Sequence, residues 1–397
     1  MSKDKTSPRT PATSLDSFAV GKLTKIAEAG LTRVTRPTDR QADMTASREG
    51  KTLISFADND YLGLSQHPEV KIAAAHAAIR YGAGSGASRL VTGDHILYLE
   101  LEERLARIKG SEAALVFGSG FMANTGIIPT LVGKNDLVLA DTLIHASMHA
   151  GIKLSGATTM LFAHNDAADA KRILEEQRGN FENVLILVEG VYSMDGDMAP
   201  IKAIAEAAAE HNAWFMVDDA HGLGVIGGGK GAVAADGASG MVPLQMGTLS
   251  KGVGAYGGYL AASKPVIELM KNRARAFIYT TALPPATIAG ASAALKLIEN
   301  DKALTAKPMQ YANYFCDALG LKTPASPIVP LLVGSADKAM AASKALEVRG
   351  FIVTAFRPPT VAEGTSRLRF CFSASHKISD IDALIKAVKS LNIVSTI

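Results

Sequence analysis

The sequence predicts an α/β protein, with a large domain built on a mainly parallel sheet and a smaller α+β domain at the C-terminal end. Between about residues 70 and 285, short apolar runs alternate with helical patterns, which is the order of a sheet covered by helices on both faces. The apolar runs are continuous, as expected for strands buried on both sides. After about residue 300 the order changes to a few strands with two further helices.

Residues 1–50 are expected to form a leader and a docking helix ahead of the large domain. The first 15 residues are polar and Pro-containing and lack the apolar region of a secretory signal, so we expect a disordered leader there. From Ser17 to about Arg33, apolar residues recur at helical spacing, which predicts the docking helix.

The large domain is expected to span residues 51–290. A short strand at 52–56 leads into the loop 58–64, and helices are expected at 99–108 and 201–210. Further strands are expected at 114–117, 137–140, 160–162, 184–188, 214–217 and 258–262. Ligands of such sheets bind at the carboxyl ends of the strands. An Ala-rich helix that follows Pro284 and Pro285 and runs to about Asn300 is expected to connect the two domains.

The smaller domain is expected to span residues 291–397. Strands are predicted at 328–333, 351–354 and 368–372, and helices at 336–349 and 378–391.

Charge and cysteine content exclude several classes of protein. The 41 basic and 38 acidic residues give a net charge of +3 without charged runs, so no nucleic-acid partner is expected. No apolar run reaches the roughly 18 residues of a membrane span. Cys316 and Cys371 lie far apart without metal-ligand spacing. We interpret them as reduced core residues of a cytoplasmic protein.

A lysine surrounded by small residues carries the strongest chemical signal. Lys251 follows a short apolar run and lies among Thr248, Ser250 and glycines. Desolvation there lowers the amine pKa and favours a Schiff base with an aldehyde cofactor. About thirty residues upstream another apolar run ends in Asp218, which is suited to keep a pyridine nitrogen protonated. The pair predicts a pyridoxal 5′-phosphate enzyme.

A glycine-rich turn at 118–124 follows a predicted strand and opens a helix, as phosphate-binding turns do. Such turns are also common for structural reasons, and the assignment depends on Asp218 and Lys251, with Thr248 adding a hydroxyl. The Gly-rich stretch 82–86 follows a helix instead of a strand, which argues against a nicotinamide site.

Two histidines lie four residues apart, but Ala146 stands where zinc proteases of that spacing have a glutamate, so no metal site is expected. His145 is a candidate to stack on the cofactor ring, and His149 is interpreted as structural. His221 is a candidate to hydrogen-bond the cofactor's phenolic oxygen, with a satisfied loop network as the alternative. Ser193 could also reach the cofactor.

Two arginines of one predicted strand, Arg367 and Arg369, share a face because side chains alternate along a strand. An arginine fork suits a carboxylate, and an amino-acid substrate needs such an anchor. A surface role for either arginine remains open. Asp195 and Asp197 are expected to hold their loop.

Five segments in order resemble the α-oxoamine synthases, over about residues 20–395. The segments are 58–64, 119–124, 189–197, 218–222 and 248–252. Members of this family are fold-type I pyridoxal 5′-phosphate enzymes that condense an amino acid with an acyl thioester and release CO₂. The resemblance therefore implies the same fold type and reaction class here.

The resemblance also implies roles for individual residues. Lys251 carries the cofactor as a Schiff base and shuttles a proton, Asp218 pairs with the pyridinium, and His145 stacks on the ring. The remaining roles are these: His221 and Ser193 at the phenolic side, Gly120, Phe121 and Thr248 at the phosphate, Thr280 or Thr281 at the phosphate of the other subunit of a homodimer, Arg369 at the amino-acid carboxylate, and Arg33 and Thr360 at the acyl substrate.

Within the family, the segments 162–166, 221–222 and 357–361 most resemble the members that use L-alanine and a pimeloyl thioester in biotin synthesis. The thioester carrier is coenzyme A or an acyl-carrier protein. The alternatives are a glycine- or serine-using member, such as a 2-amino-3-ketobutyrate ligase or a serine palmitoyltransferase, an aminotransferase or decarboxylase without thioester chemistry, and a binding protein that forms no Schiff base.

Overall fold

The computed structural model describes residues 11–393. The described residues form two compact units, of which one comprises residues 11–39 and 47–51 and the other residues 40–46 and 52–393. The second unit holds both expected domains.

The N-terminal unit contains helix α1 (Pro11–Glu28). Residues 11–15 were expected in a disordered leader, and that expectation is wrong, because they form the start of this helix; the rest of the expected leader lies outside the described residues. The helix also ends before Arg33, since Gly30 adopts a left-handed conformation with φ 65° and closes the last turn. Docking of this helix stays a prediction.

Three short strands follow: β1 (Asp39–Arg40), β2 (Thr45–Arg48) and β3 (Lys51–Ser55). The last of them matches the strand expected at 52–56. Its final residues Ile54 and Ser55 pair in parallel with β12 (Phe351–Ile352) of the C-terminal region. The start of the expected large domain therefore contributes a strand to the smaller one.

The large domain is built on a seven-stranded sheet of order β4-β10-β9-β8-β7-β5-β6. The strands are β4 (Ala113–Phe117), β5 (Leu137–Asp141), β6 (Thr158–Phe162), β7 (Val184–Glu189), β8 (Trp214–Asp218), β9 (Leu244–Thr248) and β10 (Gly258–Ala262). Five neighbouring strands, from β9 to β6, run parallel, and β10 runs antiparallel to both of its neighbours. The mainly parallel sheet is thus confirmed. Every residue of β5 and β7 is buried, as their continuous apolar sequence predicted.

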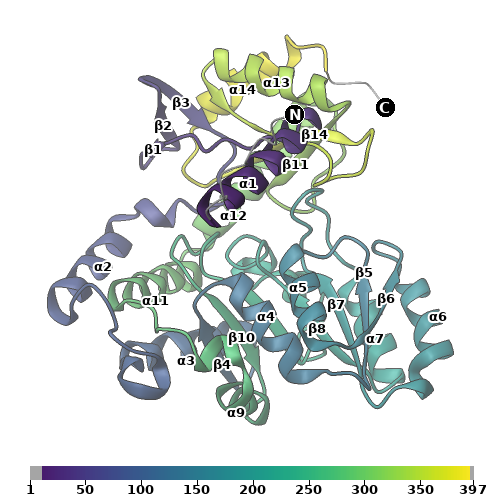
Figure 1. The fold of residues 1–397 in the computed structure, drawn as a ribbon. Coiled ribbons are helices and arrows are strands. Elements are labelled where there is room, and N and C mark those ends of the chain that lie inside the picture. Colours follow the sequence, from purple (N-terminus) through teal and green to yellow (C-terminus); the bar gives the residue numbers. More distant parts are fainter. Residues whose placement is uncertain (1–10, 394–397) are drawn as a thin grey trace, which may run out of the picture. The chain divides into compact units, whose positions relative to one another are not determined.

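Helices cover both faces of this sheet (Figure 1). One apolar core lies between the sheet and the helices α3 (Leu97–Lys109), α6 (Ala167–Gln177), α7 (Ile201–Glu210) and α11 (Pro285–Asn300). The other lies under α4 (Gly120–Leu131), α5 (Ala146–Ser155), α9 (Lys264–Arg273) and α10 (Arg275–Ile278). The helix α2 (Pro68–Tyr81) packs on α11, and the short α8 (Ala232–Ala235) follows the β8 loop.

The smaller domain has an antiparallel sheet of order β11-β14-β13. Its elements are β11 (Ile328–Gly334), β13 (Thr354–Phe356), β14 (Ser366–Cys371), α12 (Lys302–Leu319), α13 (Ala336–Val348) and α14 (Ile378–Lys389). The strand expected at 351–354 is divided in two, because β12 pairs with β3 whereas β13 pairs with β14. The helix α12, which has 18 residues and the N-cap Asp301, was not predicted from the sequence.

The boundaries at residues 50 and 290 stay predictions. Apolar side chains of α11 as far as Ile298 belong to the core of the large domain. Conversely, Phe56 packs in the core of the smaller domain, against Phe351 and Phe372. Near each expected boundary, a side chain expected in one domain therefore packs in the core of the other: Ile298 in the large core and Phe56 in the smaller one.

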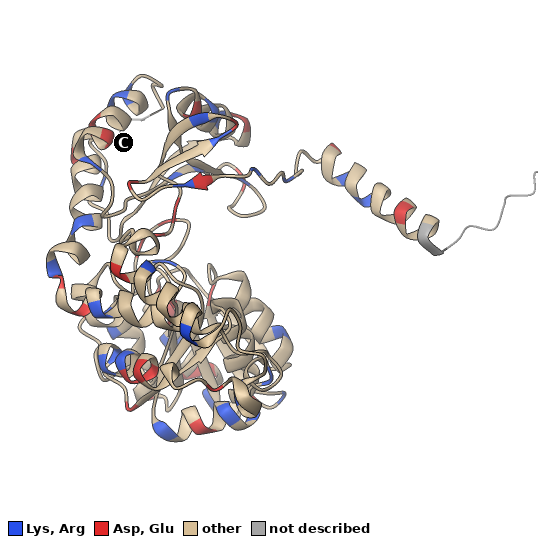
Figure 2. Ribbon diagram, turned by 90° about the vertical axis from the view of Figure 1, so that its left-hand side faces the viewer, with Lys and Arg blue, Asp and Glu red and all other residues tan. Residues whose placement is uncertain are grey.

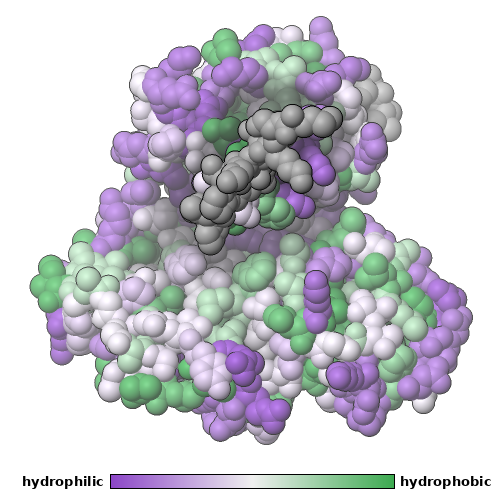
Figure 3. All heavy atoms as spheres, viewed as in Figure 1, coloured by the Kyte–Doolittle hydropathy of each residue, from purple (hydrophilic) through white to green (hydrophobic). Residues whose placement is uncertain are grey.

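Basic and acidic residues are interspersed along the described part of the chain (Figure 2). Hydrophobic and hydrophilic side chains mix on the face seen in Figure 3. Within the described residues, no helix has the length and apolar character required to cross a membrane.

Candidate active site

The candidate residues lie at the carboxyl ends of neighbouring strands. Glu189 ends β7 and pairs with Asp218, which ends β8, and Asp218 in turn pairs with Met246 of β9. Lys251 follows β9 by three residues. Because these strands run parallel, residues far apart in the sequence meet at one edge of the sheet.

Lys251 lies against a buried histidine. Its Nζ is 2.7 Å from Nε2 of His221, whose Nδ1 is 2.7 Å from the hydroxyl of Tyr61. Burial lowers the pKa of the Lys251 amine, although the carboxylate of Asp218 opposes that shift. Burial, with the positive charge of Lys251 beside it, also lowers the pKa of His221 well below its usual value. The site thus disfavours the charged forms of both the amine and the imidazole.

Asp218 is 5% exposed and held on both oxygens. Its Oδ2 accepts a hydrogen bond of 2.8 Å from Asn124, and its Oδ1 accepts one of 3.1 Å from the N–H of Ala220. The same Asn124 amide donates to the hydroxyl of Ser147 at 2.9 Å. These contacts fix the orientation of the carboxylate, and neither of them is with a cation.

His145 joins this network from the start of α5. Its Nδ1 lies 2.7 Å from the hydroxyl of Ser147 and accepts a hydrogen bond from the N–H of the same residue, which caps the helix. Partial burial lowers the pKa of the imidazole more than Asp218 raises it. His145 is an exposed residue, which leaves it accessible to a ligand, and His149 is exposed on the next turn of the helix.

The start of α4 forms the expected anion site. Ser119 caps the helix by accepting from the N–H of Met122, and the N–H groups of Gly120 and Phe121 have no partner within the helix. A Cβ on Gly120 would lie 3.5 Å from Oγ1 of Thr248, so this hydroxyl borders the turn. Backbone donors, a helix N-terminus and a buried hydroxyl are suited to a phosphate.

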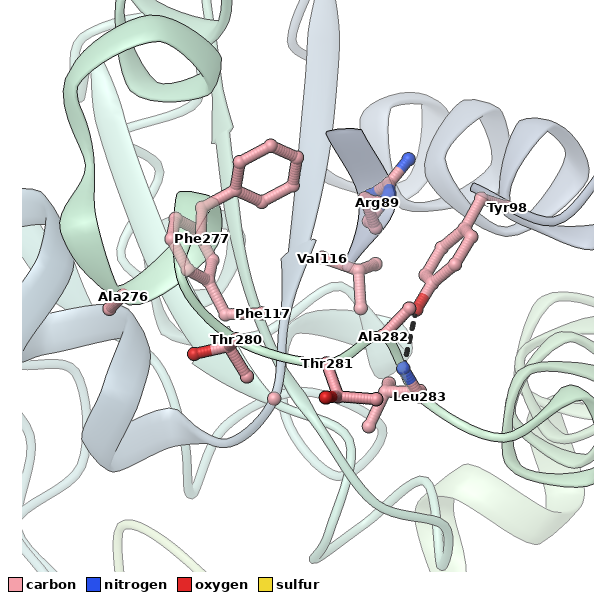
Figure 4. A pocket seen from close by; sticks show the side chains of 11 residues that line it. Arg89, Tyr98, Val116, Phe117, Ala276, Phe277, Thr280, Thr281, Ala282 and Leu283 are labelled. Carbon is pink, nitrogen blue, oxygen red and sulfur yellow. Dashed lines mark hydrogen bonds between the residues drawn. The ribbon is translucent and has the colours of Figure 1, made fainter. Parts of the chain in front are cut away.

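Thr280 and Thr281 line a small pocket at the end of β4 (Figure 4). Thr281 is bridged to Ser88, and the hydroxyl of Tyr98 accepts a 2.9 Å hydrogen bond from the N–H of Leu283. The methyl group of Thr280 lies 3.7 Å from the position that a Cβ of Gly118 would occupy. Thr280 therefore borders the turn before α4 in its own chain, while Thr281 is exposed.

The two arginines of β14 differ in their partners, although each is 6% exposed. Arg367 forms an ion pair with Asp195. Arg369 donates to the backbone oxygen of Ser193 at 2.8 Å and to Oδ1 of Asn59 at 3.2 Å, and its buried Nε has no partner among the described residues. A surface role is excluded for both, and Arg369 retains donor capacity for a carboxylate.

Three of the expected ligand contacts, those of Ser193, Thr360 and Arg33, stay predictions. Ser193 accepts from Arg369 through its backbone oxygen, and contact of its hydroxyl with a cofactor stays a prediction. Thr360 is exposed, and its backbone N–H donates a hydrogen bond of 3.0 Å to the backbone oxygen of Arg357. Arg33 is an exposed residue of the N-terminal unit. Contacts of Thr360 and Arg33 with an acyl chain therefore also stay predictions.

The structure adds a buried ion pair behind the site that the sequence did not indicate. The side chains of Lys109 and Asp219 are fully buried and lie 2.6 Å apart. Burial raises the pKa of Asp219, and the ammonium of Lys109 opposes this. A Cβ on Gly222 would lie 2.0 Å from Oδ1 of Asp219, so only glycine fits there. No local pattern marks Lys109, which ends α3 more than a hundred residues upstream.

A second histidine cluster lies at the same edge of the sheet. His164 lies between Asp141, at 3.0 Å, and Asp197, at 2.8 Å, and Asn165 donates to both carboxylates. Burial lowers the pKa of His164, but the hydrogen bonds and the negative charges of Asp141 and Asp197 outweigh burial and raise this pKa to about 10. The sequence interpretation of Asp195 and Asp197 as loop-holding residues agrees with their pairing to Arg367 and His164.

The residues present fit pyridoxal 5′-phosphate. Gly120 leaves room beside Thr248 at the phosphate end, and the buried Asp218 is available to a pyridinium. The Lys251 amine lies at the aldehyde end, and the unpartnered Nε of Arg369 is available to the carboxylate of an amino acid. The donor set thus matches the aldehyde, phosphate and ring nitrogen of that cofactor.

Comparison with known proteins agrees with this fit. The model of the aminotransferase class I and II family matches residues 51–388. The 8-amino-7-oxononanoate synthase of Beijerinckia indica is 53% identical over 95% of this chain and 98% of its own length. That of Methylocella silvestris is 58% identical over 87% of this chain and 98% of its own length.

The fold is also similar to those of solved structures. Serine palmitoyltransferase from S. paucimobilis, with a pyridoxal 5′-phosphate–myriocin adduct, superposes with a TM-score of 0.87 at 29% identity, over 96% of this chain and 98% of that one. The 8-amino-7-oxononanoate synthase from Francisella tularensis superposes with a TM-score of 0.72 at 30% identity, over 85% and 98%. The chain therefore belongs to the aminotransferase class I and II family and, within it, to the 8-amino-7-oxononanoate synthases, with pyridoxal 5′-phosphate as its cofactor.

Proposed function

We propose that this chain condenses L-alanine with a pimeloyl thioester, carried by coenzyme A or an acyl-carrier protein, and releases 8-amino-7-oxononanoate, CO₂ and the free thiol. The observation that carries the proposal is the arrangement of Lys251, Asp218 and Arg369 in a chain 53% identical to an 8-amino-7-oxononanoate synthase. A cytoplasmic location belongs to the same proposal.

Each group of the site has a task in this reaction. When bound, pyridoxal 5′-phosphate supplies the electron sink for negative charge at the amino-acid Cα. Lys251 would hold the cofactor covalently until an amino acid replaces it, and its free amine, for which a lowered pKa is suited, would then move the Cα proton. Asp218, oriented by Asn124, keeps the ring nitrogen protonated. Arg369 orients the amino acid by its carboxylate.

The remaining residues position the reactants. His145 stacks on the ring, and His221 and Ser193 face its phenolic oxygen. Gly120, Phe121 and Thr248 bind the phosphate. Arg33 and Thr360 contact the acyl chain.

A visible absorption titration of the cofactor-loaded protein tests the substrate. We expect the cofactor band to change most with L-alanine, less with glycine and L-serine, and the addition of pimeloyl-coenzyme A to yield 8-amino-7-oxononanoate detected by mass spectrometry. A preference for glycine or serine would contradict the proposed substrate. Absence of the band would contradict the role of Lys251.

The carboxylate anchor is tested by comparing the two arginines of β14. Arg369→Gln should raise KM for L-alanine by about tenfold or more, since a charged hydrogen bond contributes about 1.5–3 kcal/mol. Arg367→Gln is the matched control, because it has the same 6% exposure but pairs with Asp195. It should lower thermal stability with a smaller change in KM. Equal KM values for the two variants would contradict the assignment.

We further propose a homodimer in which Thr280 or Thr281 reaches the phosphate of the partner subunit. The large domain exposes several apolar side chains, which supports a protein interface. They are Ile79, Leu90, Val91, Ile96, Leu99, Phe121 and Tyr279. Light scattering after gel filtration should give the mass of a dimer.

Subunit mixing tests whether the threonines act on the partner. A Lys251→Ala chain is mixed with a Thr280→Val/Thr281→Val chain, each with low activity alone. If the threonines act in trans, the hybrid contains one intact site and regains activity; if they act in cis, next to Gly118 of their own chain, no activity returns.

A further inference from the structure

The loop residue Tyr61 contacts the catalytic histidine from the side opposite the lysine. Tyr61 follows β3 and is fully buried, and its hydroxyl lies 2.7 Å from Nδ1 of His221. Nε2 of the same imidazole faces Nζ of Lys251 at 2.7 Å. Both ring nitrogens of His221 are thus engaged, one by a phenol and one at the reacting amine.

The geometry decides which way the phenol hydrogen points. The only other contact of the Tyr61 hydroxyl among the described residues is Oδ1 of Asn59, at 3.3 Å. Because O–H···O hydrogen bonds in proteins span about 2.5–3.0 Å, the hydrogen bond to Asn59 is long, and the contact of 2.7 Å to Nδ1 of His221 is the stronger one. The phenol hydrogen is therefore directed at Nδ1.

We propose that Tyr61 is a positioning residue that fixes His221 as the Nε2–H tautomer, so that the imidazole presents a hydrogen-bond donor toward Lys251 and the phenolic oxygen of the cofactor. A neutral imidazole carries one hydrogen, and an O–H donated to Nδ1 leaves that hydrogen on Nε2. The placement of the phenolic oxygen rests on the proposed function, whereas the tautomer itself does not.

The protonation states of both groups agree with this assignment. Burial raises the pKa of Tyr61 well above its ordinary value, so the phenol keeps its hydrogen. Burial lowers the pKa of His221, and any positive charge on Lys251, Arg369 or His145, which face it, lowers that pKa further. The imidazole is therefore kept from taking a second proton, which would abolish the acceptor at Nδ1.

Nitrogen-15 NMR of histidine-labelled, cofactor-free protein tests the tautomer directly, with the His221 signals assigned from a His221→Asn variant. The wild-type protein should show Nε2 protonated and Nδ1 unprotonated. The reverse pattern would overturn the proposal without any variant. Because the measurement needs no turnover, its result can contradict the proposed tautomer while the proposed function stands. Equally, the proposed function can be contradicted while the proposed tautomer stands.

Tyr61→Phe then removes only the hydroxyl oxygen. We expect a mixture of tautomers at His221 and, in the loaded protein, a shifted pH for the transition of the cofactor's visible band, with a larger fall in kcat than rise in KM. Tyr259→Phe is the matched control, since Tyr259 is equally buried and its hydroxyl has no partner among the described residues. An unchanged tautomer in Tyr61→Phe, with native thermal stability, would overturn the assigned role.

Discussion

Two histidines at the same edge of the large sheet, the buried His221 and the half-buried His164, have pKa values that are shifted in opposite directions. His221 follows β8 and lies between a phenol and an amine, whereas His164 follows β6 and lies between the carboxylates of Asp141 and Asp197. Burial lowers the pKa of both imidazoles. At His164 the carboxylates overcome burial and raise the pKa to about 10, whereas at His221 positive charge on Lys251 adds to the effect of burial.

The comparison shows that the charge of the neighbours determines whether the effect of burial on the pKa of a histidine is reinforced or overcome. A neutral His221 can offer one donor and one acceptor to a site where protons move. A cationic His164 ties the end of β5 to the loop after β7. That loop also carries Ser193 and Asp195, which contact the two arginines of β14. The second cluster therefore supports the geometry of the first.

The largest expected effect comes from removing the amine beside His221. Lys251→Ala should lower kcat by about 10²–10⁴-fold or more, because both the covalent link and the proton transfer are lost. Product formation and the visible band of the covalently held cofactor measure the two effects. Retention of the band together with near-native kcat would contradict the role assigned to Lys251.

His164→Gln should have the next largest effect, on stability. The glutamine can hydrogen-bond but cannot neutralise Asp141, which is fully buried, so unfolding should require about 1–3 kcal/mol less free energy. Urea denaturation at pH 7 measures this difference. The control is Lys171→Gln, at the exposed ion pair with Glu210, where a change within about 0.5 kcal/mol is expected. Equal losses for the two variants would contradict a structural role of the cation.

The contribution of His164 should depend on pH in a definite direction. Its pKa is raised from 6.5 to about 10 in the folded state, so its stabilisation is fully present below pH 6.5 and is lost as the pH rises toward 10. After screening by solvent at this half-buried site, we expect the wild type to lose about 1–2 kcal/mol relative to His164→Gln over that window. A difference independent of pH would show that the imidazole is neutral at pH 7.

The smallest effect should come from the exposed partner of the cluster. The Asp197 side chain is 39% exposed, so Asp197→Asn should cost about 0.2–1 kcal/mol and lower the pKa of His164 without returning it to its usual value. Asp141→Asn should cost more, because its carboxylate also accepts from the N–H groups of Leu143 and Asn165. Histidine NMR titration of the two variants gives the order, and the reverse order would contradict it.

Local patterns predicted most of the fold and part of the site. Continuous apolar runs gave the buried strands of the large sheet within one or two residues, because burial on both faces leaves no polar position. Asp218 ends one strand of the large sheet and Lys251 follows its neighbour, so their meeting at one edge was predictable. Arg369 lies in β14 of the smaller sheet, so its approach to them was not. The helix α12 was missed, and residues 11–15 were wrongly expected to be disordered.

Only the tertiary structure decided the partners of the polar groups. Asn124 and Asp218 are 94 residues apart, Lys109 and Asp219 are 110 apart, and Tyr61 and His221 are 160 apart. Such pairs leave no periodicity in the sequence, because each is made by one contact across the fold. Protonation follows from these contacts, since a pKa depends on the charges and donors around a group in space. The sequence by itself therefore determined the strands and the residues that carry the chemistry, and the tertiary structure determined the state in which His221, His164 and Lys251 carry it.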